Sequence, residues 1–178
     1  MACYKSICLL LILTCQNANG ATHLKFTKID TKIVASDIVN QAQIRFYEHN
    51  NRSYLNAFGS LKRFVHSFEI KSSVNLREKN NRTMQLIKVT LDGCKFLGGG
   101  YKSKVINLFL KIVQEHAATK LICPLQANFN YTLSEWNLDE NLIPAFIPDC
   151  DITAPIEVFI KRRKFLSLLF FAKIYRVD

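Results

Sequence analysis

The end of the chain places the strongest constraint on the fold, because apolar residues there alternate with a period of two. Within 165–174 one face carries Leu166, Leu168, Phe170, Ala172 and Ile174, and the other face adds Phe165, Leu169 and Phe171. Successive side chains of a strand point to opposite faces, so this pattern predicts a β-strand with at least one buried face. The apolar run at 165–172 is too short for a membrane helix, which takes about 20 residues.

Further strands are predicted wherever the same alternation recurs. They are expected at 63–71, at 87–92, at 23–29, around Ile44 and Phe46, and at 156–160. In the first of these, His66 lies on the apolar face and is expected to be a core histidine. The basic run Lys-Arg-Arg-Lys at 161–164 separates the last two strands and predicts the turn of a closing hairpin.

One segment has helical periodicity instead. Residues 102–116 contain no glycine or proline and place Val105, Phe109, Ile112 and Val113 at helical spacing. Prolines 144, 148 and 155 break the following region into loops or short extended pieces. Strands, one helix and more strands predict a mainly β protein, an immunoglobulin-like antiparallel β-sandwich with one helix inserted between strands.

The first twenty residues have the features of a secretion signal. Lys5 precedes an uncharged apolar run from Ile7 to Leu13, and Ala18-Asn19-Gly20 matches the small-residue pattern of a cleavage site. We therefore expect residues 1–20 to be removed and residues 21–178 to form one domain in the extracellular space. Loss of Lys5 lowers the net charge from +10 to +9, and this positive excess favours anionic partners such as lipid headgroups or sulfated glycans.

Cysteines and glycosylation motifs agree with a secreted protein. Cys94, Cys123 and Cys150 follow the predicted signal, so one disulfide and one remaining thiol are expected, and spacing alone does not decide which two residues pair. Glycosylation motifs begin at Asn51, Asn81 and Asn130.

No catalytic motif is present. The glycine-rich stretch 93–104 has Gly93 and Gly98 at the spacing of a phosphate-binding loop, but Gly99 stands where that loop needs its lysine, so a turn from strand to helix is predicted. The four histidines, His23, His49, His66 and His116, lack any metal-binding spacing, and no serine-hydrolase elbow occurs. The prediction is a protein that is not an enzyme and has no metal, cofactor or catalytic residue.

Three ordered motifs resemble a known family. Asp-x-Cys-Lys-Phe-Leu at 92–97, Cys-Pro at 123–124 and Pro-x-x-x-Pro at 144–148, followed by the terminal hairpin, resemble a large insect family of small secreted proteins described only as a domain of unknown function. Its layout is similar to the ML lipid-recognition superfamily, the ganglioside-activator-like sandwiches, and some relatives are chemosensory CheB proteins. The resemblance implies a sandwich whose sheets part to admit an apolar ligand, with Cys94 and Cys123 as disulfide partners.

The chain departs from that family in two places. Cys150 stands where relatives usually have a glycine, which accounts for the odd thiol. Many relatives also have an upstream cysteine pair, and residues 21–93 contain no cysteine.

Two functional hypotheses follow. The favoured one is a secreted module that binds a hydrophobic small molecule or lipid between its sheets, with a chemosensory use. Its ligand is expected to contact Phe146, Val158, Ile160, Leu168 and Phe170, and a register error of one residue would move these side chains to the opposite face. The alternative is a cationic extracellular protein that acts through the basic run 161–164 on an anionic surface or a membrane receptor. No nucleic-acid partner is expected.

Overall fold

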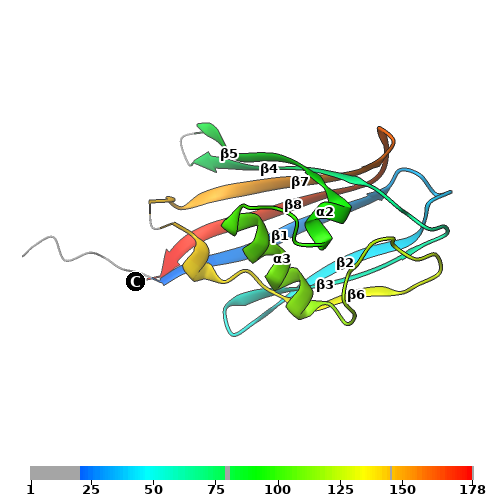
Figure 1. Cartoon of the computed structure of the whole chain (residues 1–178). Coiled ribbons are helices and arrows are strands. Elements are labelled where there is room, and N and C mark those ends of the chain that lie inside the picture. The colour runs from blue at the N-terminus through cyan, green and yellow to red at the C-terminus, as the bar shows by residue number, and fades with distance from the viewer. Residues whose placement is uncertain (1–20, 79–80, 145, 178) are drawn as a thin grey trace, which may run out of the picture.

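The protein consists of two antiparallel sheets packed face to face (Figure 1). The computed structural model describes residues 21–78, 81–144 and 146–177. The predicted signal segment lies outside the described residues. Strands dominate these residues, and the predicted fold class, a mainly β antiparallel sandwich, is confirmed.

The two sheets differ in width. The larger has five strands in the order β1-β8-β7-β4-β5, and the smaller has three in the order β2-β3-β6. The larger sheet is built from β1 (Ala21–Ile33), β4 (Glu69–Glu78), β5 (Thr83–Asp92), β7 (Cys150–Ile160) and β8 (Arg163–Val177). The smaller sheet is built from β2 (Val39–His49), β3 (Arg52–Leu61) and β6 (Tyr131–Trp136).

The closing hairpin predicted from the basic run is present. Lys161 and Arg162 form a two-residue turn between β7 and β8, with φ of 47° and 66°. Positive φ at both turn residues is the geometry whose twist matches that of paired strands. The hairpin register pairs Val158 with Leu166 and Ala154 with Phe170.

Apolar residues from both sheets form the core. One cluster, made by Phe26, Leu55 and Ala172, joins β1, β3 and β8 and receives side chains from β2 and β6. A second, around Leu76, Ile147, Cys150 and Ile174, lies beneath the segment that precedes β7. A third lies near the β7–β8 turn and contains Ala35, Ile38, Val39, Leu61, Val65 and Phe165.

A short helix stands where the sequence predicted only a turn. Helix α2 (Gly93–Leu97) begins because the Asp92 carboxylate accepts a hydrogen bond of 2.8 Å from the Lys95 amide. A Cβ at Gly93 would overlap the Phe68 ring, so only glycine fits there. The glycine run ends this helix, since Gly99 has a φ of 69°.

The predicted inserted helix is confirmed as α3 (Lys104–His116). The Ser103 hydroxyl accepts a hydrogen bond from the Ile106 amide and caps its start. None of the residues of α3 is fully buried, and the helix lies against β6. A single 3₁₀ turn, Glu140–Leu142, follows β6.

The predicted strand at 63–71 is confirmed only for 69–71; it is wrong for 63–68, and His66 is not the core histidine that was expected. Strand β4 begins only at Glu69, and both Phe64 and His66 are exposed. Val65 between them is buried, because its amide and carbonyl both bond to Leu125 at 2.9 Å and turn its side chain inward. Strands β3 and β6 were not predicted, since neither has a regular apolar alternation.

Candidate functional site

An apolar pocket of about 210 Å³ lies between the two sheets. All three strands of the smaller sheet contribute to one wall, β8 contributes to the other, and the segment after α3 supplies one residue. The lining residues are Ala42, Gln43, Ile44, Ala57, Phe58, Gly59, Leu121, Tyr131, Thr132, Leu133, Leu166 and Leu168.

The pocket exists because small residues face each other across β2 and β3. Ala42 pairs with Gly59, and Ile44 pairs with Ala57. Paired residues of antiparallel strands point to the same face. The inward positions Ala42, Ala57 and Gly59 therefore have side chains of one carbon or none. The leucines of β8 opposite them cannot fill the space that larger side chains would occupy.

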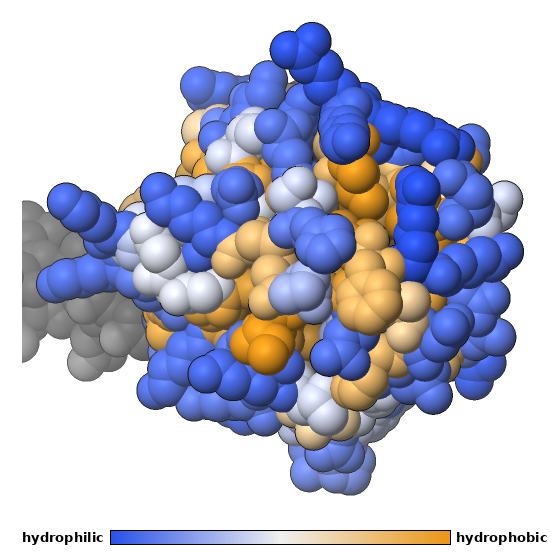
Figure 2. Space-filling view, turned by 45° about the vertical axis from the view of Figure 1, so that its right-hand side comes forward, coloured by the Kyte–Doolittle hydropathy of each residue, from blue (hydrophilic) through white to orange (hydrophobic). Residues whose placement is uncertain are grey.

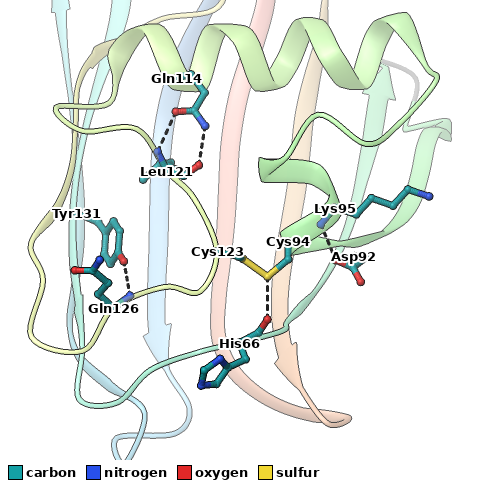
Figure 3. The surroundings of a disulfide bond; sticks show 9 residues. All are labelled: His66, Asp92, Cys94, Lys95, Gln114, Leu121, Cys123, Gln126 and Tyr131. Carbon is teal, nitrogen blue, oxygen red and sulfur yellow. Dashed lines mark hydrogen bonds between the residues drawn. A yellow bond between two sulfur atoms is a disulfide. The ribbon is translucent and has the colours of Figure 1, made fainter.

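A side chain of helix α3 fixes the position of Leu121, the lining residue that follows this helix. The Gln114 side chain accepts a hydrogen bond of 3.0 Å from the Leu121 amide and donates one of 2.9 Å to the Leu121 carbonyl (Figure 3). Both backbone groups of Leu121 are therefore held by one helical side chain. Another wall residue, Tyr131, is fixed by its hydroxyl, which accepts a 2.7 Å hydrogen bond from the Gln126 amide.

A disulfide joins the short helix to the same segment. Cys94 in α2 is bonded to Cys123, as the family resemblance implies, with their Cα atoms 5.5 Å apart (Figure 3). The Cys94 sulfur lies 3.3 Å from the His66 carbonyl oxygen. A disulfide sulfur carries no proton, so this is a close sulfur–oxygen contact and not a donated hydrogen bond.

Cys150 is a buried free thiol at the start of β7. Burial raises the pKa of its thiol, and the carboxylates of Asp151, Asp149 and Glu78 raise that pKa further. The thiol is therefore protonated at neutral pH and is a poor nucleophile.

Trp136 lies next to the pocket at the end of β6. It packs against the same cluster as the wall residues Ile44, Ala57 and Leu133. Its indole Nε1 is buried and has no hydrogen-bond partner among the described residues. A buried donor of this kind costs about 1–3 kcal/mol when it stays unpaired.

The residues predicted to line a ligand site occupy different places. Leu168 lines the pocket. Val158 and Ile160 pack against the cluster near the β7–β8 turn, and Phe170 packs against Phe26 with ring centroids 6.2 Å apart. Phe146 is 76% exposed, whereas the next residue, Ile147, is 1% exposed. The structure thus turns Ile147 and not Phe146 toward the interior.

The small residues of the pocket were not predicted, because the predicted ligand site consisted of large apolar side chains. Nothing in the local sequence marks Ala42, Ala57 or Gly59 as neighbours. Alanine or glycine at inward positions of two adjacent strands is the only signal, and it requires the register of β2 and β3 to be known.

The three predicted glycosylation sites have exposed side chains. Asn51 lies in the two-residue turn between β2 and β3, with a φ of 60°. Asn81 lies in the turn between β4 and β5, and Asn130 immediately precedes β6. Their modification remains a prediction.

Other features of the described residues bear on enzyme and membrane functions. Within 21–78, 81–144 and 146–177, no three His, Cys, Asp or Glu side chains are grouped so that they could hold a metal. No helix in the described part of the chain has the length and apolar character needed to cross a membrane. A larger groove of about 470 Å³ lies over the five-stranded sheet, but polar residues such as Asn75, Arg77, Asp151 and Lys173 contribute to its lining.

The part of the chain from β4 to the first half of β7 matches a known protein family. Residues 70–154 match the family described as "Protein of unknown function (DUF1091)". No curated protein matches the chain. The match contains all three motifs on which the family resemblance was based.

Two solved structures are similar over most of the chain. Chicken MD-1, crystallised in complex with lipid IVa, is 14% identical, with 88% of this chain and 99% of that chain covered and a TM-score of 0.42. A Niemann-Pick type C2 protein from the Japanese carpenter ant is 13% identical, with 87% and 95% covered and a TM-score of 0.33.

Proposed function

We propose that this chain is a secreted, non-enzymatic module that binds an apolar small molecule or a lipid chain between its sheets. The observation that carries the proposal is the pocket itself, whose inward positions Ala42, Ala57 and Gly59 leave space facing Leu166 and Leu168. A packed sandwich needs no such run of small residues, because its interior is normally filled to high density.

The size of the pocket limits the ligand. At about 210 Å³ it is larger than the engineered cavity of about 150 Å³ that binds benzene, and smaller than most drug-sized sites. It therefore suits one ring or a short acyl segment. A ligand that buries 200 Å² of apolar surface would gain about 5 kcal/mol before ordering costs are subtracted.

The indole of Trp136 adds a chemical preference. Trp136 shares a cluster with the wall residues Ile44, Ala57 and Leu133 but does not itself line the pocket, so a ligand oxygen that displaced these side chains and reached the unpaired Nε1 would recover a hydrogen bond. We expect an alcohol, ketone, ester or fatty acid to bind more tightly than a hydrocarbon of equal length.

The biological setting is part of the proposal. The signal-like segment, the disulfide and the three glycosylation motifs, whose asparagines are exposed, support passage through the secretory pathway. The resemblance to chemosensory proteins supports an external chemical signal as the ligand.

Native mass spectrometry of the secreted protein tests the proposal. The expected result is a co-purified apolar molecule, or a stoichiometric adduct after incubation with alcohols and fatty acids of graded length. Ala42→Leu should abolish the adduct, because the added side chain enters the pocket where the paired residue, Gly59, leaves room.

Gln41→Leu is the matched control, since Gln41 is exposed on the outer side of β2 and is not among the residues that line the pocket. Trp136→Phe should keep binding but remove the preference for oxygenated ligands. Absence of any adduct with the unmodified protein would overturn the proposal, as would equal binding by Ala42→Leu with its fold retained.

A further inference from the structure

Cations gather at the end of the sandwich that holds the β7–β8 turn. Lys161, Arg162 and Arg163 lie in and beside this turn, and Lys62 and Arg63 follow β3; all five are exposed. We call these five residues the basic end. Figure 1 shows the β7–β8 turn and the connections β1–β2 and β3–β4 at the same end of the molecule.

Asp37 forms ion pairs with two residues of the basic end, Arg163 and Arg63. Asp37 accepts hydrogen bonds of 2.8 and 3.0 Å from the Arg163 guanidinium and lies 3.5 Å from that of Arg63. Lys62 is attached to the same β1–β2 connection, since its amide donates to the Ile38 carbonyl at 2.8 Å. Among the described residues, no other carboxylate forms an ion pair with these five cations, so a large positive excess remains.

Two large apolar side chains are exposed among these cations. Phe64, next to Arg63, is 58% exposed, and Val34 is 44% exposed. The Val34 amide donates to the Phe165 carbonyl at 3.0 Å, which places Val34 beside the start of β8. Figure 2 turns this end toward the viewer and shows apolar surface bordered by hydrophilic side chains.

Rigid backbone presents both apolar residues. Val65, which follows Phe64, and Ala35, which follows Val34, are both buried in the core cluster near the turn. Exposure of Phe64 and Val34 therefore results from fixed neighbours that point the other way. The Phe64 ring also stacks on that of His66, with ring centroids 6.4 Å apart, so its exposed face has a defined orientation.

We propose that the basic end docks on the surface of an anionic lipid membrane, with Phe64 and Val34 entering the interface between headgroups and acyl chains. Lysine and arginine near an anionic bilayer are each attracted to its negative surface potential. Apolar side chains between such cations gain further by leaving water. A sulfated glycan offers the charge but gives Phe64 no apolar environment, so the combination favours a membrane.

Docking does not require an occupied pocket, so this inference and the proposed function can fail separately. Vesicle binding is measured by co-sedimentation of the protein with phosphatidylcholine vesicles that either contain or lack phosphatidylserine. The expected result is binding to the vesicles that contain phosphatidylserine, weakened by added salt because the attraction is screened.

The decisive variant is Lys161→Asn with Arg162→Gly. Asn-Gly is the preferred pair for a turn with positive φ at both residues, so this change removes two charges and keeps the hairpin. Binding should weaken by about 30-fold, which corresponds to about 1 kcal/mol for each cation. The matched control is Arg45→Gln with Lys88→Gln, two exposed cations on β2 and β5 that lie away from the basic end.

Phe64→Ser tests the apolar contribution while all charges are kept, and it should weaken vesicle binding several-fold without changing the binding of apolar ligands. Equal losses in the turn variant and in its control would overturn the proposal. Binding to neutral vesicles that matches binding to anionic ones would do so as well. An unaffected Phe64→Ser protein that binds heparin more tightly than vesicles would replace the membrane with a glycan.

Discussion

The ring of Phe109 in α3 lies 6.2 Å from the indole of Trp136 in β6. Trp136 lies 6.4 Å in turn from Phe26 in β1. The three rings connect the helix to both sheets. Trp136 is the only tryptophan in the chain, so its fluorescence reports on the helix, the core and the adjacent pocket together.

Phe109→Ala should loosen α3 from β6. Phe109 is 47% exposed, so we expect about half the loss of a buried phenylalanine, about 2 kcal/mol of unfolding free energy. Urea unfolding followed by Trp136 emission measures this loss. Val105→Ala on the same helix is the control, because Val105 is 67% exposed and should cost less than about 0.5 kcal/mol. Equal effects of the two changes would show that the aromatic contact does not hold the helix.

Removal of the disulfide should destabilise the fold by about 3–4 kcal/mol, because the bond closes a loop with a sequence separation of 29 residues. The variant is Cys94→Ala combined with Cys123→Ala, and denaturant unfolding gives the difference. Cys150→Ala, which leaves the bond intact, should cost only about 1 kcal/mol. Peptide mapping without reduction checks the pairing, and a Cys150 peptide bonded to either partner would contradict it.

The buried thiol of Cys150 predicts a dependence of stability on alkaline pH. Burial raises its pKa in the folded chain, so the folded protein keeps a proton that the unfolded chain loses above about pH 8.5. The unfolded state then binds fewer protons, and the unfolding free energy falls as pH rises from that value.

Comparison with Cys150→Ala isolates this contribution, since other groups titrate equally in both proteins. The difference in unfolding free energy between the two proteins should decrease steadily above about pH 8.5. Alkylation of the native thiol should also be slow and become fast in denaturant. Rapid alkylation of the folded protein at pH 7 would contradict the assigned burial.

Two substitutions remove the glycosylation motif at Asn51, and they should differ in their effect on the stability of the protein. Ser53 is buried, and its hydroxyl accepts a 3.1 Å hydrogen bond from the Phe26 amide, so Ser53→Ala should lose the glycan and about 1–2 kcal/mol. Asn51→Gly should lose the glycan alone, because Asn50-Gly is well suited to a turn with positive φ at both residues. Mass spectrometry and thermal unfolding separate the two effects, and a mass change no larger than that of the substitution itself in both variants would mean that Asn51 carries no glycan.

Local pattern predicted several elements of this fold correctly. Alternation along Leu166, Leu168 and Phe170 identified the inward face of β8, because a strand with one buried face must repeat every two residues. Helical spacing identified α3, and the basic run identified the last turn. These features depend on residues close to one another in the chain.

Only the tertiary structure decided the inward direction of Val65, the placement of Ile147 rather than Phe146 in the core, and the pocket. Val65 turns inward because Leu125, sixty residues later, bonds to its backbone. The pocket arises because the register of β2 and β3 places Ala42 opposite Gly59. Cross-strand register depends on pairing between distant segments, so the alternation within either strand alone could not reveal which small residues would meet and leave space.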